Sequence, residues 1–193
     1  MMIDMGIRHK GTVQIETIRL VLRRFEETDA KDMFQNWAGD PEVCKYLSWG
    51  PHTSEEASRK RILSWISGYV RYNSYVWALQ EKKRGRVIGS ISVEIANDMA
   101  GLCEVGYCLS REYWNQGLMT EALRAVMHYL FYEIGYQRIQ AKHDVLNVAS
   151  GRVMQKAGMV YIRTEEKVGL RKDGTYYDCD VYMKEAENIS YMT

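Results

Sequence analysis

Regular spacing of hydrophobic residues divides the chain into strand-like and helix-like segments. Alternation of apolar and polar residues, or a short apolar run, predicts a strand, whereas apolar residues at every third or fourth position predict a helix. The strands predicted in this way cover residues 17–25, 75–81, 87–95, 102–109, 138–143, 159–168 and 175–183. Helices are predicted after Thr28–Asp29, Thr53 and Asn147, and a further helix is predicted to continue from the segment Tyr113–Ala122.

The predicted helix ends carry residues that commonly cap helices. Thr53 and Glu56 fit a capping box, in which the hydroxyl and the carboxylate each satisfy a free backbone N–H group. Asn147 is a typical N-cap residue for the last helix. Gly135 and Gly158 mark the ends of the last two helices, because glycine readily adopts the left-handed conformation found there.

The order of the predicted elements indicates one mixed α/β fold. Strands 75–81, 87–95 and 102–109 are joined by short polar turns, which favours an antiparallel meander. The last two strands form a hairpin around Lys172–Gly174. No repeat or low-complexity tract interrupts this order.

Length and charge narrow the class of protein. A chain of 193 residues suits one domain, which we place at 17–185 between an N-terminal tail (1–16) and a C-terminal tail (186–193). The net charge is +1 with acids and bases interspersed, so we expect neither nucleic acid nor a membrane surface as partner. No apolar stretch reaches the ~20 residues that span a bilayer. Residues 1–11 lack the apolar core of a secretory signal, and we expect a cytoplasmic protein.

The cysteines and histidines do not form a recognisable metal-binding or disulfide pattern. The cysteines are Cys44, Cys103, Cys108 and Cys179, and no two of them form a C-x-x-C pair. The histidines do not complete a metal-ligand spacing. We therefore expect free thiols and no metal.

The segment Tyr113–Ala122 carries the clearest functional signal. It joins a predicted strand to a strongly patterned helix and contains a single glycine, Gly117, between polar residues. Such a loop leaves backbone N–H groups unpaired at the positive end of a helix, where a phosphate or pyrophosphate can bind. The glycine patterns of a P-loop and of a dinucleotide-binding fold are both absent.

Two segments resemble motifs of the GNAT acyltransferases. Trp114–Ala122 is similar to that family's coenzyme A pyrophosphate loop, and Asn147–Met159 to its "N-x-x-S-x-[RK]-V-[ML]-x-K-x-G-[MF]" helix. Tyr46–His52 and Asp173–Asp178 are similar to segments of the ribosomal-protein-alanine N-acetyltransferase-like branch. The likeness runs from Thr17 to Lys184. Two separated motifs in the right order make a specific signal.

The loop departs from the superfamily pattern [QR]-x-x-G-x-[GA] at two positions. Trp114 occupies the first and Met119 the last. The branch that the chain resembles tolerates both residues, so they bear on the shape of the loop.

The resemblance implies the fold and the acyl donor. It implies an α/β fold of the α+β type, with a mostly antiparallel sheet of about seven strands and four helices, splayed between the fourth and fifth strands. The donor is acetyl-CoA, whose pantetheine arm pairs with the freed strand edge like an added strand. The residues expected to contact it are Tyr107, Cys108, Leu109, Gln116, Gly117, Leu118, Met119, Thr120, Asn147 and Ser150. Thr120 and Asn147 are alternatively plain helix caps, and Lys156 either reaches the donor or is a solvated cation near a helix end.

Acetyl transfer to a primary amine needs a group that removes a proton from the nitrogen. Glu104 is the first candidate, because several GNAT enzymes place a glutamate there and the strand period puts it on one face with Gly106 and Cys108. The alternative is a glutamate paired with a neighbouring Arg or Lys. His143 is the second candidate, and its alternative is a hydrogen-bonded structural histidine.

The proton donor for the departing thiolate stays open. Met154 fills the position at which some family members carry an acidic tyrosine. Tyr107, Tyr161, Tyr176 or water are the remaining choices. An acyl-cysteine route through Cys108 lacks an evident neighbouring base, which favours direct transfer.

The acceptor is predicted only as a class. Trp49 and His52 are expected to line its pocket, whereas Trp65 lies on an apolar helix stripe typical of the core, and Asp178 either binds a cationic acceptor or is a surface charge. The acceptor is a protein N-terminus or a small-molecule amine. The alternatives are a non-catalytic acyl-CoA-binding module and a loop that binds ATP. The family resemblance is compatible with a monomer or a homodimer.

Overall fold

The fold is built around one open sheet of eight strands. A computed structural model describes residues 6–171 and 174–187. The sheet order is β1-β2-β3-β4-β5-β6-β8-β7, and every neighbouring pair is antiparallel except β5 and β6. The strands are β1 Ile15–Glu16, β2 Leu20–Arg23, β3 Val76–Glu81, β4 Val87–Asn97, β5 Leu102–Leu109, β6 Arg138–Asp144, β7 Val160–Leu170 and β8 Tyr176–Glu185. The predicted meander is β3-β4-β5.

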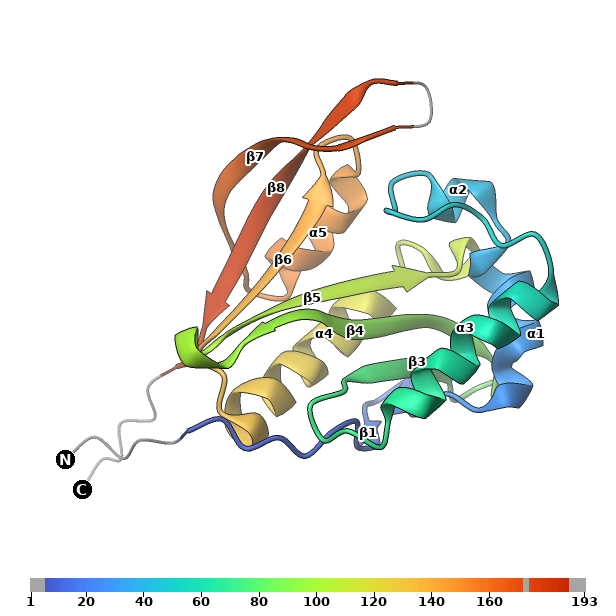
Figure 1. Ribbon diagram of the computed structural model, residues 1–193, viewed down its shortest axis with the longest axis horizontal. Helices are drawn as coiled ribbons and strands as arrows, with labels where there is room; N and C mark the ends of the chain where they lie inside the picture. Colours follow the sequence, from blue (N-terminus) through green and yellow to red (C-terminus); the bar gives the residue numbers. More distant parts are fainter. Residues whose placement is uncertain (1–5, 172–173, 188–193) are drawn as a thin grey trace.

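Helices cover both faces of this sheet (Figure 1). The α-helices are α1 Ala30–Met33, α2 Pro41–Cys44, α3 Glu55–Gly68, α4 Leu118–His128 and α5 Val148–Lys156. Two of them run on into π-helical turns, Phe34–Ala38 after α1 and Tyr129–Ile134 after α4. Short 3-10 turns cover Glu27–Asp29, Asp98–Ala100 and Arg111–Tyr113. Among the described residues, no helix is long and apolar enough to cross a membrane.

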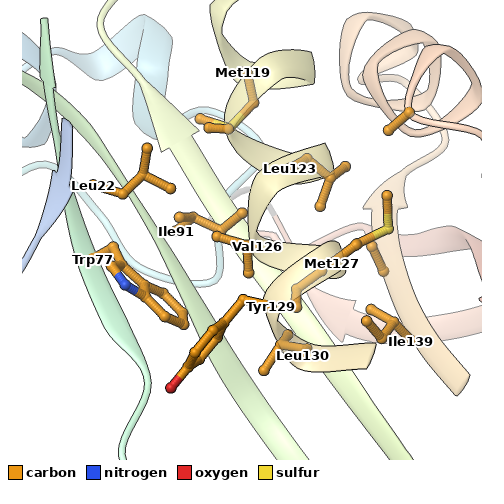
Figure 2. Close-up of a cluster of buried hydrophobic side chains, with 14 of the residues drawn as sticks. Leu22, Trp77, Ile91, Met119, Leu123, Val126, Met127, Tyr129, Leu130 and Ile139 are labelled. Carbon is orange, nitrogen blue, oxygen red and sulfur yellow. The ribbon is translucent and has the colours of Figure 1, made fainter. Parts of the chain in front are cut away.

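The larger core lies between α4 and the sheet. The helix buries a stripe that includes Met119, Leu123 and Val126 against strand residues such as Trp77 and Ile91 (Figure 2). A second cluster, which includes Phe25, Met33, Trp37 and Ile62, packs under α1 and α3 on the opposite face. Burial of apolar surface in these two clusters, at about 25 cal/mol per Å², supplies most of the driving force for folding.

The sheet divides at β5. This strand pairs with β4 along its whole length, from Leu102 to Leu109. It pairs with β6 only at Leu102, Cys103 and Glu104. Beyond that point β5 and β6 visibly diverge (Figure 1), while β6 stays paired with β8 along its whole length, from Arg138 to Asp144. The predicted splay between the fourth and fifth predicted strands is therefore confirmed, and it leaves the edge of β5 from Val105 onward without a strand partner among the described residues.

The structure has one strand and one helix more than the sequence predicts. The extra strand, Ile15–Glu16, lies in the predicted tail and pairs with Val21–Leu22, and Thr17, the predicted start of the first strand, lies instead in the turn between β1 and β2. The extra helix, α2, starts at Pro41, and the side chain of Asp40 accepts a hydrogen bond from Glu42 N–H.

The predicted capping box of α3 is wrong by one residue. Ser54 has an extended backbone and its hydroxyl accepts a hydrogen bond from Ala57 N–H at 3.2 Å, so Ser54 rather than Thr53 is the N-cap. Glu56 is consequently shifted out of the reciprocal position and pairs with Arg59 at 3.4 Å. The predicted Asn147 cap and the helix end before Gly158 are confirmed.

Part of the predicted N-terminal tail is packed against the domain. The indole of Trp77 donates to Val13 O at 2.7 Å, and the Tyr129 hydroxyl donates to Gly11 O at 2.7 Å. Thr12 is buried and connects to β3 through its side chain. Residues 1–5 and 188–193 of the predicted tails, and Lys172 and Asp173 of the last predicted turn, lie outside the described residues.

Replacing Thr12 tests whether this segment belongs to the folded unit. The Thr12 hydroxyl donates to Ser74 O at 3.0 Å and accepts from Val76 N–H at 2.9 Å. Because Thr12→Ala leaves both buried backbone groups unpaired, we expect it to lower the free energy of unfolding by about 1–3 kcal/mol. Urea denaturation measures the change, with Thr53→Ala, an exposed threonine, as control. Equal stability of the two variants would contradict the packing of this segment.

Candidate functional site

The loop between β5 and α4 has a shape that only a few residue types allow. Asn115 and Gly117 both have positive φ, at 59° and 76°. Glycine adopts this conformation without steric cost, and asparagine tolerates it better than most residues. The indole of Trp114 donates to Leu109 O at 2.8 Å and the Gln116 amide donates to Glu112 O at 2.8 Å. These bonds fix the loop to the end of β5.

The loop presents free backbone N–H groups at the start of α4. Gly117 is the N-cap and supplies no side-chain oxygen to the helix. Leu118, Met119 and Thr120 are the first helical residues, so their N–H groups have no acceptor within the helix. The first N–H group that bonds within the helix is that of Glu121, which donates to Gly117 O at 3.0 Å. Together with the helix dipole, this arrangement fits an anion.

The first three side chains of α4 are largely buried. Leu118 and Met119 are buried in the main core, so only their backbone groups are open to a ligand. Thr120 is also largely buried, and it occupies the third helical position rather than the N-cap. The alternative in which Thr120 caps α4 is therefore wrong.

A cavity of about 890 Å³ lies over the first turns of α4. Its charged lining residues are Arg19, Glu121, Arg124 and Lys156. Arg124 donates to the carbonyl of Lys156 and so connects α4 to the end of α5. Three cations and one carboxylate make this cavity suited to an anionic ligand.

The unpaired edge of β5 lies between this loop and α5. Tyr107 reaches from it to α5, where its hydroxyl lies 3.0 Å from the Ser150 hydroxyl and donates to Ser150 O at 3.1 Å. Burial raises the pKa of Tyr107, in spite of its hydrogen bond with Ser150. Asn147 accepts a bond from Ser150 N–H at 3.4 Å, so its side chain caps α5.

Cys108 points to the opposite face of β5. Its sulfur lies 3.2 Å from the Ser90 hydroxyl and packs against the second core cluster. Burial raises its pKa to about 11, while the contact with Ser90 lowers it. The thiol is therefore protonated at neutral pH, and its reactivity as a nucleophile is low.

Glu104 lies where β5 and β6 part. Its carboxylate accepts a hydrogen bond from the Gln140 amide at 2.7 Å and pairs with Lys142 Nζ at 3.2 Å. The residue is only 6% exposed. Both partners come from β6, on the face of that strand opposite to the buried Ile139 and Ala141. The ion pair that we considered as an alternative is thus present at the fork, the point where β5 and β6 part.

His143 lies on the other face of β6, beneath α5. Its Nδ1 donates to Asp144 O at 2.8 Å, because a carbonyl only accepts, and in this tautomer of the neutral ring Nε2 carries the lone pair. Nε2 is buried, finds no hydrogen-bond partner among the described residues, and lies 2.6 Å from where a Cβ on Gly151 would stand. The ring packs on Tyr182 at 5.6 Å. The structure therefore does not bring His143 together with Glu104.

Glu94 is a carboxylate near the fork that the sequence analysis missed. A register shift between Val93 and Ile95 bulges β4 at this residue. Its Cγ lies 2.9 Å from where a Cβ on Gly106 would stand, so the side chain crosses the face of β5 that also carries Cys108. Ser92 donates to it, and none of the ion pairs among the described residues includes it. The bulge depends on strand pairing, which the local pattern of residues does not report.

The predicted acceptor residues lie in the loop after α2. Figure 1 shows this loop beyond the end of β5, facing the β7–β8 hairpin. The rings of Trp49 and His52 are 5.5 Å apart, and His52 Nδ1 lies 2.8 Å from the Ser58 hydroxyl. Burial, and then the charge of Arg61, lower the pKa of His52. Trp65 packs on Phe25, in keeping with its place on an apolar stripe.

The remaining candidates lie on the β7–β8 hairpin. Tyr161 bonds to Thr164 at 2.9 Å and Tyr176 is exposed, so neither tyrosine reaches the fork as Tyr107 does. Asp178 accepts a hydrogen bond from Lys167 N–H at 2.7 Å, which makes it part of the hairpin. Within residues 6–171 and 174–187, no cluster of three or more His, Cys, Asp or Glu side chains is arranged to hold a metal.

Known proteins are similar to this chain in sequence and in fold. A family model described as an acetyltransferase (GNAT) domain matches residues 19–160. The protein named N-acetyltransferase p20 of Bacillus licheniformis is 29% identical over 81% of this chain and 84% of its own. The ribosomal-protein-serine acetyltransferase of Escherichia coli is 24% identical over 88% and 96% of the two chains.

Solved structures agree with these matches. The ribosomal-protein-S5-alanine acetyltransferase of Vibrio fischeri has the same fold, with a TM-score of 0.79 over 91% of this chain and 98% of that one, at 20% identity. A GNAT-family acetyltransferase of Bacillus anthracis has a TM-score of 0.78 over 90% and 98%, at 24% identity. Because the family model covers most of the chain, and includes the loop at α4 and the α5 helix, the chain belongs to the GNAT acetyltransferase family.

Proposed function

We propose that this acetyltransferase binds acetyl-CoA between the α4 loop and α5 and transfers the acetyl group directly to a primary amine. One observation carries the proposal. The uncapped start of α4 lies next to the strand edge of β5 that β6 leaves unpaired. A pyrophosphate fits the first feature, and an amide-containing arm fits the second.

The residues of the fork fit the order of groups along the donor. With the pyrophosphate at the N–H groups of Leu118 to Thr120, the pantetheine arm follows the edge of β5 from Leu109 toward Val105. Its reactive end then comes to Glu104, where the pairing with β6 begins. Coenzyme A supplies the activated acyl group as a thioester, and the chain's own residues orient it and move protons.

Direct transfer fits the surroundings of Cys108. An acyl-cysteine intermediate needs a thiolate, and burial raises the pKa of this thiol to about 11. In direct transfer the amine nitrogen forms a bond to the acetyl carbon while the carbon–sulfur bond breaks. The proton leaves the nitrogen for a carboxylate, directly or through water, and the thiolate takes a proton from Tyr107 or from water.

Two carboxylates have different places in this scheme. Glu104 lies at the reactive end of the proposed donor path and pairs with Lys142, which suits a base that works through water. Glu94 is exposed and forms no ion pair among the described residues, which suits attraction of the acceptor's ammonium group before it loses its proton. His143 is buried on the opposite face of β6, and we assign it a structural role.

The acceptor is a primary amine on a protein N-terminus or a small molecule. The names of two relatives refer to ribosomal proteins, which supports a protein N-terminus. The loop with Trp49 and His52 is the part of this chain that we propose to border the acceptor.

Incubation with acetyl-CoA and a panel of amines tests the function. We expect acceptor-dependent release of free thiol, and an upward shift of the melting temperature with CoA but not with ATP. Binding of CoA without thiol release for any acceptor would instead support a non-catalytic acyl-CoA-binding module. Stabilisation by ATP alone would contradict the donor assignment.

Replacing Glu104 tests the base. Glu104→Gln keeps the hydrogen bond to one partner and removes the charge, so we expect kcat to fall by roughly 10²–10⁴-fold with little change in the affinity for CoA. Steady-state kinetics over a range of pH measures this. Glu166→Gln, an exposed glutamate on β7, is the matched control.

Glu94→Gln separates the two carboxylates. We expect it to raise the KM for the amine by roughly threefold to tenfold and to leave kcat nearly unchanged, because an exposed charge contributes modestly. A large fall in kcat for Glu94→Gln, with Glu104→Gln near normal, would reverse the two roles.

Cys108→Ala distinguishes direct transfer from an acyl-cysteine route. Because the thiol takes no part in direct transfer, we expect kcat to stay within about threefold of the unchanged protein. Loss of activity in a folded Cys108→Ala variant, with an acetylated protein trapped in the unchanged chain, would overturn direct transfer.

A further inference from the structure

The turn between β1 and β2 is joined to the first turn of α4 by one carboxylate. Glu121 Oε1 accepts hydrogen bonds from the Thr17 hydroxyl at 2.6 Å and from Arg19 N–H at 2.8 Å. Its Oε2 accepts from Arg19 Nε at 2.7 Å. The Glu121 side chain is 17% exposed and that of Arg19 is 46% exposed, so the carboxylate is largely shielded from water while the guanidinium group stays partly open to it.

The same arginine also holds the loop before α4. Arg19 Nη1 donates to Gln116 O at 2.8 Å. Its Nη2 lies 3.6 Å from where a Cβ on Gly117 would stand. The guanidinium group thus spans the distance from Glu121 in the helix to the peptide that precedes the helix.

This peptide needs support from outside the loop. It lies between two residues with positive φ, Asn115 and Gly117, and no side chain caps the helix. In a trans peptide the C=O and N–H groups point in opposite directions. By holding Gln116 O, Arg19 therefore fixes the direction of the Gly117 N–H group and of the turn that carries the free N–H groups.

The charge of Glu121 makes this cluster unusual for an anion site. Burial alone would raise the pKa of Glu121, but the hydrogen bonds from Thr17 and Arg19 together lower it, so the carboxylate stays charged. A negative charge in the first turn of α4 repels a phosphate bound there. On charge alone, removing it would strengthen the binding of the donor.

We propose that Arg19, oriented by Glu121, is a positioning residue that holds the α4 loop in its donor-binding shape. This inference rests on the proposed function, because the donor is taken to be coenzyme A. The bonds that Glu121 makes to Thr17 and Arg19 outweigh its repulsion of the ligand.

Glu121→Gln gives a test in which the sign of the effect decides. The Gln amide places an N–H donor or a weaker acceptor against Arg19 Nε. This weakens the clamp, by which we mean the hydrogen bonds that join Glu121 to Thr17 and Arg19 and Arg19 to Gln116 O. We expect CoA to bind roughly threefold to tenfold more weakly, measured by calorimetry. Unchanged or tighter binding, the result that charge alone predicts, would overturn the inference.

Replacing Arg19 completes the test. We expect Arg19→Gln to weaken CoA binding by about tenfold to a hundredfold and to raise the KM for acetyl-CoA more than it lowers kcat. Arg19→Lys keeps the charge but cannot contact Glu121 and Gln116 O together, so we expect little recovery. Full recovery by lysine would show that only the charge matters and would overturn the positioning role.

The controls separate a local effect from loss of folding. Arg59→Gln removes the ion pairs that Arg59 of α3 makes with Glu27, Glu55 and Glu56, far from the loop in sequence, and should leave CoA binding unchanged. Circular dichroism sets a temperature at which every variant is folded. If Glu121→Gln does not fold, Thr17→Val removes one bond of the clamp and takes its place. No CoA binding by the unchanged chain would overturn the proposed function, whereas normal binding by all variants would overturn the clamp alone.

Discussion

The early end of the pairing between β5 and β6 is the constraint on which the rest of the site depends. Backbone N–H and C=O groups in a folded protein are nearly always paired, with protein or with water. Here the ladder between β5 and β6 stops after Glu104, while β6 stays paired with β8 on its other side. The open edge of β5 that follows leads directly to the uncapped start of α4. The fold thus leaves two adjacent rows of backbone groups for one ligand.

The charged residues at the fork follow from the same division. Where two strands part, their facing side chains enclose a space that neither strand fills. Glu104 occupies it, and a buried carboxylate is costly unless it is paired and hydrogen-bonded. Gln140 and Lys142 provide both interactions from β6. The pairing that holds the fork in shape therefore also holds a carboxylate at the reactive end of the proposed donor path.

The sequence predicts those features that depend on neighbouring residues. The stripe of α4 follows from its spacing, and the cap at Asn147 from its chemistry. The N-cap of α3 is predicted at Thr53 and lies at Ser54. This shows the limit of such local signals, because adjacent residues can both cap a helix. Family resemblance adds the splay and the place of Glu104, which spacing alone does not specify.

Features that depend on contacts distant in sequence escape prediction. Thr12 belongs to the fold through hydrogen bonds to residues more than 60 positions away. Glu94 reaches Gly106 only because of a bulge in β4. Strand alternation puts His143 on one face with Ile139 and Ala141, but only the packing of α5 on β6 makes that face a buried one. None of these placements leaves a trace in a short window of sequence.

The near-zero net charge of the chain is compatible with a highly anionic ligand because the charges are arranged locally. Arg19, Arg124 and Lys156 surround the first turns of α4, and the helix dipole adds to them. Glu121 is the exception, and a carboxylate free to move would compete with a phosphate for the same N–H groups. Three donors from the β1–β2 turn keep it facing away from them. Glu121 looks unfavourable by charge, but it orders the arginine that supports the loop. In the proposed site, binding of the anionic donor depends on the geometry of these charged groups more than on their net charge.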